Sequence, residues 1–165
     1  MKKTALVTLL IALLGIFTLS ACFAEAESTA EAAPATLLDR ALLVAEDRDQ
    51  LIILTEDDLL DLIGIEYEDY TDFAYLVALD ALTGRELIAL QAADEEAAAR
   101  IVELLQGYLA QRLHETQNYL PDVYRLLSKA EVKQNDLLIV LSLAAPVEGE
   151  DDLLLSGEEM LLTEE

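Results

Sequence analysis

The stretch that most restricts the fold is Phe73–Leu79, an uncharged run of aromatic and aliphatic residues that follows an acidic segment. A short apolar run rich in β-favouring residues predicts a strand that is buried on at least one face. The connection Asp80–Gly84 ends in Thr-Gly, which is typical of a turn, and Glu86–Gln91 then returns to aliphatic residues. The two runs therefore predict a β-hairpin.

A second hairpin is predicted later in the chain. Glu131–Lys133 and the aliphatic run Leu137–Leu143 would pair about the turn Gln134–Asp136. Asn and Asp tolerate the positive φ that a tight turn requires, and Pro146 is expected to end the pairing.

Short helices are predicted where a capping residue precedes apolar residues at helical spacing. Thr36 with Asp39, and Thr55 with Asp58, have the spacing in which a threonine and an acidic residue close the first turn of a helix. Gly64 is expected to end the second helix in a left-handed conformation.

The longest predicted helix begins after Asp94 and continues to about Gln117. Its apolar stripe, which includes Tyr108, predicts that it lies across the sheet, while polar residues such as Arg112 are expected mostly away from that stripe. Gly107 inside it costs about 1 kcal/mol relative to Ala, which suggests close approach of a neighbouring strand or side chain. Leu51–Leu54 is too short to assign and could be a brief extended segment. Two further helices are predicted, at Pro121–Leu127 and Glu148–Leu155.

The order of these elements predicts an α+β fold. Its two hairpins would form an antiparallel sheet of about four strands, with the long helix and the shorter helices packed on one face. We expect a single domain over residues 37–155, preceded by an acidic tether at 22–36 and followed by an acidic tail at 156–165.

Residues 1–21 have the three-part layout of a secretory signal. Two lysines precede an apolar run of about 15 residues, and the small residues Ser20 and Ala21 stand before Cys22. That run is shorter than the roughly 18 to 20 residues that carry a helix across a bilayer, so a retained membrane span is the weaker interpretation.

The sequence Leu19-Ser20-Ala21-Cys22 resembles the lipobox of bacterial lipoproteins. The resemblance implies cleavage between Ala21 and Cys22, a diacylglyceryl group on the Cys22 sulfur, and a lipid-anchored protein on the extracytoplasmic face of the cell membrane. Acyl chains such as palmitate supply about 0.8 kcal/mol per buried CH₂, and two chains anchor far better than one. The alternative is an ordinary secreted protein whose signal happens to contain a cysteine.

Composition excludes several functional classes. Cleavage before Cys22 would remove 21 of the 165 residues and leave 144, and the loss of Lys2 and Lys3 would change the formal charge from −23 to −25. That charge argues against nucleic acid and anionic lipid as electrostatic partners. Cys22 is the only cysteine and His114 the only histidine, so neither a disulfide framework nor a two-imidazole site can form. We therefore expect no metal and no cofactor.

The chain also resembles a known family. The motifs are Leu62-Ile63-Gly64-Ile65 ahead of Tyr70, Glu86 opening a strand, an acid-started long helix, and Tyr-Leu-Pro-Asp-Val-Tyr at 119–124. Together they are similar to small lipoproteins of Firmicute bacteria with domain of unknown function 4358. The resemblance covers about Leu37–Leu155, implies an extracytoplasmic lipoprotein domain and supplies no catalytic residues. The last hairpin departs from the family, since residues 135–137 are Asn-Asp-Leu where it tends to have a glycine and an aromatic.

Acidic clusters are the first candidates for a site. A predicted helix carries three of these carboxylates and the following loop carries four: Asp57, Asp58 and Asp61, then Glu66, Glu68, Asp69 and Asp72. Crowded carboxylates could hold Ca²⁺, which takes about six to eight oxygen ligands, but the spacing of an EF-hand loop is absent. A solvated acidic face is the simpler interpretation.

Catalytic arrangements have less support. A glycosidase-like carboxylate pair would need an aromatic sugar platform, and the chain has no tryptophan. His114 could act as a general base with Thr116 or Ser128, but a histidine near a helix C-terminus is more often structural, and no nucleophile elbow is present. Tyr119 and Tyr124 are expected to pack helices rather than to form a binding platform.

The sequence thus predicts a non-catalytic binding or accessory module at the cell surface. Its inferred partner is the lipid bilayer, reached through diacylglyceryl-Cys22, and no protein or small-molecule ligand follows from the residues. Two alternatives make different structural predictions. An enzyme of unrecognised type requires a concave pocket with at least two inward-facing polar or titratable residues, and an assembly protein requires an exposed apolar patch or an unpaired sheet edge.

Overall fold

A computed structural model describes residues 36–156 of the chain. The predicted signal at 1–21, Cys22 itself, nearly all of the tether at 22–36 and the acidic tail beyond Ser156 lie outside the described residues.

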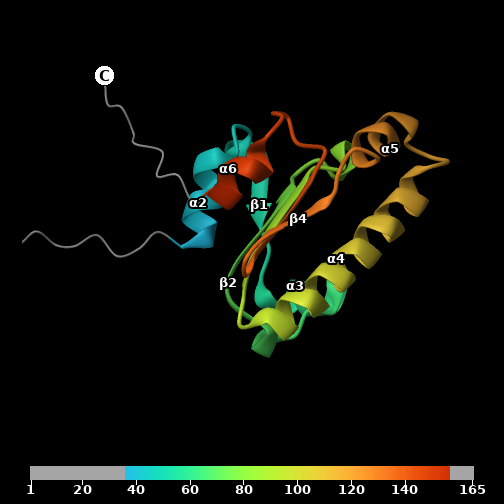
Figure 1. Cartoon of the computed structure of the whole chain (residues 1–165). Helices are drawn as coiled ribbons and strands as arrows, with labels where there is room; N and C mark the ends of the chain where they lie inside the picture. Colours follow the sequence, from blue (N-terminus) through green and yellow to red (C-terminus); the bar gives the residue numbers. More distant parts are fainter. Residues whose placement is uncertain (1–35, 157–165) are drawn as a thin grey trace, which may run out of the picture. The chain divides into compact units, whose positions relative to one another are not determined.

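An antiparallel sheet of five strands forms the centre of the fold, in the order β1-β2-β3-β5-β4 (Figure 1). Both predicted hairpins are present in it. The strands are β1 Leu51–Ile53, β2 Tyr70–Ala78, β3 Glu86–Ala92, β4 Val132–Asn135 and β5 Leu138–Leu143. The α+β prediction is confirmed, and the strand count is one higher than the predicted four because Leu51–Ile53 forms an edge strand on β2.

Five α-helices accompany this sheet within residues 36–156: α2 Leu37–Val44, α3 Glu56–Ile63, α4 Glu95–Thr116, α5 Pro121–Leu127 and α6 Glu150–Ser156. Thr36 and Thr55 each cap the helix that follows through a reciprocal bond with the acidic residue three positions on. Gly64 ends α3 with a φ of 84°, a left-handed conformation that favours glycine.

The helices cover both faces of the sheet, and the expectation that they pack on one face is wrong. One core lies between the sheet and α3, α4 and α5, and a second lies between the sheet and α2 and α6 (Figure 1). In β3, Ile88 and Leu90 belong to the first core, whereas Leu87 and Ala89 belong to the second. Since successive side chains of a strand point to opposite faces, a strand that is apolar at every position needs cover on both sides.

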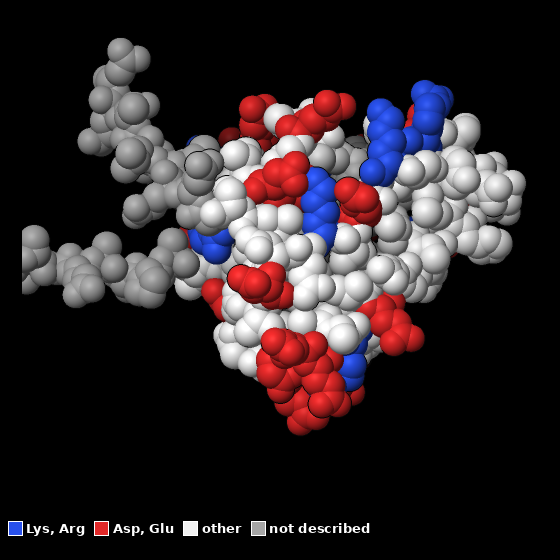
Figure 2. Space-filling view, in the orientation of Figure 1, with Lys and Arg blue, Asp and Glu red and all other residues white. Residues whose placement is uncertain are grey.

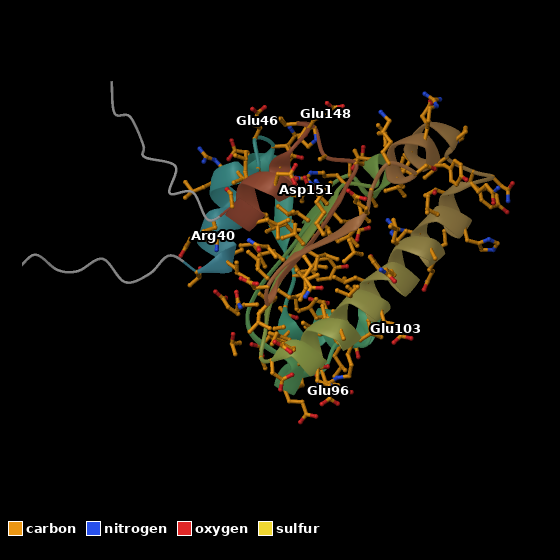
Figure 3. The ribbon with its side chains drawn as sticks, in the orientation of Figure 1. Arg40, Glu46, Glu96, Glu103, Glu148 and Asp151 are labelled. Carbon is orange, nitrogen blue, oxygen red and sulfur yellow. The ribbon has the colours of Figure 1, made fainter. Side chains whose placement is uncertain are left out.

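A buried network of ion pairs and hydrogen bonds holds α2 and α6 against the sheet. The Arg85 guanidinium lies 2.5 Å from Glu150 Oε1 of α6 and 3.1 Å from Asp47 Oδ2, which follows α2. The other oxygen of Glu150 accepts a hydrogen bond from Ser142 Oγ on β5. Arg40 of α2, labelled in Figure 3, also donates to the Leu154 carbonyl of α6. These bonds tie the N-terminal and C-terminal helices to each other and to the sheet.

Candidate functional site

Two adjoining hollows lie on the α3–α4 side of the sheet, and both are lined by Leu62 and Tyr108. The outer one, called the groove below, has a volume of about 580 Å³ and runs between α3 and α4. Its lining consists of Leu62, Ile63, Arg100, Glu103, Leu104, Gly107, Tyr108 and Gln111. The inner hollow has a volume of about 230 Å³ and has apolar walls that include Leu54, Val77 and Ala81.

Four polar side chains meet in the inner hollow: Tyr75, Glu86, Tyr108 and Arg112. The Tyr108 hydroxyl donates to Glu86 Oε2 over 2.6 Å, and the Tyr75 hydroxyl lies 3.2 Å from that of Tyr108. Arg112 donates to Glu86 Oε1 from Nε over 2.8 Å, with Nη2 at 2.7 Å. Glu86 is only 5% exposed, so its charge depends on these partners rather than on water.

Backbone periodicity explains why these residues converge. Tyr108 and Arg112 are four residues apart on α4 and therefore share one face of the helix. Glu86 opens β3 with its side chain on the same face of the sheet as Ile88, which is paired with Tyr75 of β2. The long helix crosses that face, so its polar pair reaches the carboxylate.

The electrostatics of the cluster keep its phenols protonated. Burial, with a smaller contribution from the Glu86 charge, raises the pKa of Tyr75 to about 12. Burial and the adjacent Glu86 carboxylate also raise the pKa of Tyr108 far above its usual range. Burial disfavours the charged form of Arg112, but its interactions with Glu86, Tyr108 and Glu115 together outweigh burial and raise the pKa of the guanidinium. At neutral pH the hydroxyls are therefore hydrogen-bond donors or acceptors and not bases.

Gly107 widens the groove. A Cβ atom placed on Gly107 would meet no atom within 4 Å, apart from its own helix backbone and chain neighbours. The expectation that a neighbouring strand or side chain approaches this glycine is therefore wrong. Open space lies above it, bordered by Leu62 of α3, which is 53% exposed.

Four members of the acidic clusters have separate structural roles, and the other three, Asp61, Glu66 and Glu68, are exposed. Asp58 caps α3, Asp72 accepts the backbone N–H of Leu37 at the start of α2 over 2.8 Å, and Asp69 lies 2.6 Å from the Arg100 guanidinium. Within residues 36–156 no three carboxylate, histidine or cysteine side chains are placed where they could hold a metal ion together. Asp57 accepts a hydrogen bond from the Tyr67 hydroxyl, which raises the pKa of that phenol to about 12.

The predicted partners of His114 are directed elsewhere. His114 is exposed on α4, whereas the hydroxyls of Thr116 and Ser128 donate to the carbonyls of Arg112 and Tyr124 within their own helices. Tyr124 is half-buried, but Tyr119 is 86% exposed, so the expectation that Tyr119 packs a helix is wrong.

Sequence reasoning missed the polar cluster over β3. The helical pattern predicts Tyr108 in the apolar stripe and Arg112 mostly away from it, although the two residues share a face of α4. The available signal was Glu86, a charged residue that opens an otherwise aliphatic strand. A carboxylate in that position needs a cation or several donors when the strand is buried, and α4 supplies both.

The groove and the inner hollow lie within the part of the chain that matches a known protein family. Residues 46–144 match the model of a family described as Domain of unknown function (DUF4358). The matched segment contains every residue that lines the groove and the inner hollow, and it excludes α2 and α6. Neither the curated proteins nor the solved structures gave a match. None of the helices within residues 36–156 combines the length and the apolar character that a membrane span requires.

Proposed function

The chain belongs to the family described as Domain of unknown function (DUF4358), and we propose that it is a lipid-anchored binding module whose ligand enters the groove between α3 and α4. Cys22 would carry the diacylglyceryl group and the domain would lie on the extracytoplasmic face of the cell membrane. The residues between Cys22 and Thr36 can extend by at most about 45 Å, which would let the domain stand clear of the headgroups.

One observation carries the binding proposal: a concave groove with apolar walls leads to a small set of convergent polar groups. Pockets that bind ligands typically have volumes of about 300 to 1,000 Å³ and are mostly apolar, with a few polar groups that fix orientation. The groove measures about 580 Å³. Its apolar residues include Leu62, Ile63 and Leu104, and Tyr108 joins it to the inner hollow.

Binding is favoured over catalysis because the titratable groups satisfy one another. Both oxygens of Glu86 are occupied, one by Tyr108 and one by Arg112. The raised pKa values of Tyr75 and Tyr108 remove both phenols as general bases near neutral pH. A general acid or base has to exchange its proton with a substrate, whereas a saturated network holds its geometry.

An enzyme is the second candidate, because the inner hollow contains the inward-facing titratable residues that such an enzyme requires. Glu86 is the residue on which the two candidates differ. For an enzyme, Glu86→Gln would abolish turnover of the bound ligand and preserve its binding. For a binding module, the bound ligand is recovered chemically unchanged from the wild-type protein.

The proposal is tested by photo-crosslinking on intact cells, with a photoreactive amino acid in place of Leu62. Leu62 is exposed and lines both hollows, so a ligand in the groove would be captured there. The matched control is Leu43 of α2, which is also exposed but lies in the opposite helix layer. We expect a discrete adduct from position 62 and none from position 43. Equal labelling at both positions, or none at 62, would contradict the proposal.

A further inference from the structure

We propose that the occupant of the groove is a cationic amphipathic helix, presented by a peptide or by another protein. The inference rests on the proposed function, since it names the ligand class of the same groove. Three features of the described residues support it: the line that the groove follows, the space above Gly107, and the excess of acidic residues on the two helices that form its walls.

The groove follows the axis of α4. Its lining residues on α4 recur at intervals of three or four positions, which places them on one face of the helix: Arg100, Glu103, Leu104, Gly107, Tyr108 and Gln111. At a rise of about 1.5 Å per residue this face extends for about 16 Å, or three helical turns. A straight groove of that length fits a helix that inserts side chains at positions i, i+3, i+4 and i+7.

The middle of the groove has room for such side chains. Gly107 lies near the centre of the row and has open space above it, and Leu62 and Leu104 border that space from α3 and α4. A residue without a side chain allows a second helix to approach the backbone closely, as small residues do at helix–helix contacts. Leu62 remains 53% exposed, so it offers apolar surface that an incoming side chain would bury.

The two helices that form the walls of the groove carry more acidic than basic side chains. The α3 helix contains Glu56, Asp57, Asp58 and Asp61 and no basic residue. Figure 2 shows one group of acidic side chains at the lower end of the molecule, and Figure 3 labels two acidic residues of α4, Glu96 near that end and Glu103 higher along the helix.

Both arginines of α4 are already neutralised. Arg100 forms ion pairs with Asp69 and Glu96. Arg112 forms ion pairs with Glu86 and Glu115. An anionic ligand would find no free cation in the groove lining, because Arg100 is its only basic residue. A ligand with lysine or arginine along its rim would meet Glu103 and the α3 carboxylates, and its apolar face would meet Leu62 and Leu104.

The test uses a synthetic 14-residue peptide of leucine and lysine whose leucines recur at helical spacing. It is titrated against the full chain carrying Cys22→Ser, so that no acyl chain or bilayer competes for the peptide. A peptide of the same composition in an order without an apolar face, and a leucine–glutamate peptide with the same pattern, are the ligand controls. We expect the leucine–lysine peptide to bind with an affinity that falls as salt is added. The affinities of the two control peptides should be at least tenfold lower.

Gly107→Leu separates the groove from general attraction to an acidic protein. This change fills the groove, leaves the charge unaltered and replaces a poor helix former by a good one, so the fold is retained. Gln106→Leu is the matched control, because Gln106 is exposed on the same helix and does not line the groove. We expect at least a tenfold loss of affinity for Gly107→Leu and wild-type affinity for Gln106→Leu.

Equal affinity of the wild type and Gly107→Leu would mean adsorption to the acidic surface and would overturn the inference. So would tighter binding of the leucine–glutamate peptide, or no binding at all. In each of those cases the crosslinking experiment on cells could still succeed. An adduct at position 62 that is lost when Gly107→Leu is added would still support the groove as a binding site. The two proposals can therefore fail separately.

Discussion

Arg85 and Glu86 are adjacent at the start of β3, both are buried, and their side chains form ion pairs on opposite faces of the sheet. Arg85 lies 2.5 Å from Glu150 on the α2–α6 side, and Glu86 lies 2.7 Å from Arg112 on the α4 side. Alternation along the strand sends the two charges in opposite directions. Each helix layer is thus attached to the central strand through a buried charge as well as through apolar contacts.

Removal of the Glu86 carboxylate should destabilise the fold. Glu86→Ala leaves Arg112 without its buried partner and the Tyr108 hydroxyl without its acceptor. We expect the free energy of unfolding to fall by about 2 to 3 kcal/mol, below the full cost of a broken buried pair because Arg112 is partly exposed. Urea denaturation measures this change. Glu115→Ala, which removes the more exposed partner of the same arginine, should cost less than about 1 kcal/mol. Equal losses for the two variants would contradict the assigned role of Glu86.

Loss of the Glu150 carboxylate should loosen the second helix layer. Glu150→Ala removes an acceptor of Arg85 and of Ser142, while Asp47 remains paired with Arg85. We expect amide hydrogen exchange in α6 and α2 to accelerate by at least tenfold, with little change in the centre of α4. Hydrogen-exchange mass spectrometry resolves these segments. A uniform acceleration over all helices would show that the network does not act locally.

Two glycine substitutions should change stability in opposite directions. Gly64→Ala forces a side chain into a φ of 84° and should cost about 1 kcal/mol, since the space around Gly64 is otherwise adequate. Gly107→Ala lies within α4 with open space above it and should stabilise the protein by about 1 kcal/mol. Thermal unfolding of the two variants beside the wild type measures both changes. A destabilised Gly107→Ala protein would mean that the groove is not open at that residue.

Alkaline pH should weaken the fold through the buried phenols. The pKa of Tyr75 rises from 10.0 to about 12 in the folded protein, so the folded state keeps a proton that the unfolded state releases near pH 10. This stabilisation is complete below pH 10 and is lost as the pH rises toward 12, by up to about 2 kcal/mol. Urea denaturation at a series of pH values measures the loss.

Removal of both phenols provides the control for that pH dependence. The double variant Tyr75→Phe, Tyr108→Phe should lose less stability than the wild type over the same pH interval. Tyr119→Phe removes one phenol outside the cluster and should follow the wild type. A double variant with the wild-type pH dependence would exclude these two hydroxyls as its source.

Local signals predicted most of the elements. The threonine caps at 36 and 55, the C-terminal Gly64 and the two hairpins depend on residues close together in sequence, and each is present. The segment Leu51–Leu54 is not assigned from the sequence because four residues are too few to show a period, and the pairing of β1 with β2 is a tertiary contact.

The second helix layer and the polar cluster needed long-range information. The aliphatic runs of β3 and β5 were a usable sign that both faces are covered, since a half-exposed strand would alternate. The cluster joins Glu86 to Tyr108 and Arg112 across two elements. Helical spacing alone shows that the last two share a face but not that this face meets a carboxylate.

The lipid anchor is tested by a single change at Cys22. A serine there offers no thiol for acylation, so Cys22→Ser should move the protein from the membrane fraction to the medium or stall removal of the signal. Ser20→Ala keeps a small residue before the cleavage position and should leave membrane association unchanged. Cell fractionation and intact mass spectrometry distinguish these outcomes, since loss of the diacylglyceryl group changes the mass. Membrane association and mass that are the same in Cys22→Ser and the wild type would show that another element holds the protein at the membrane.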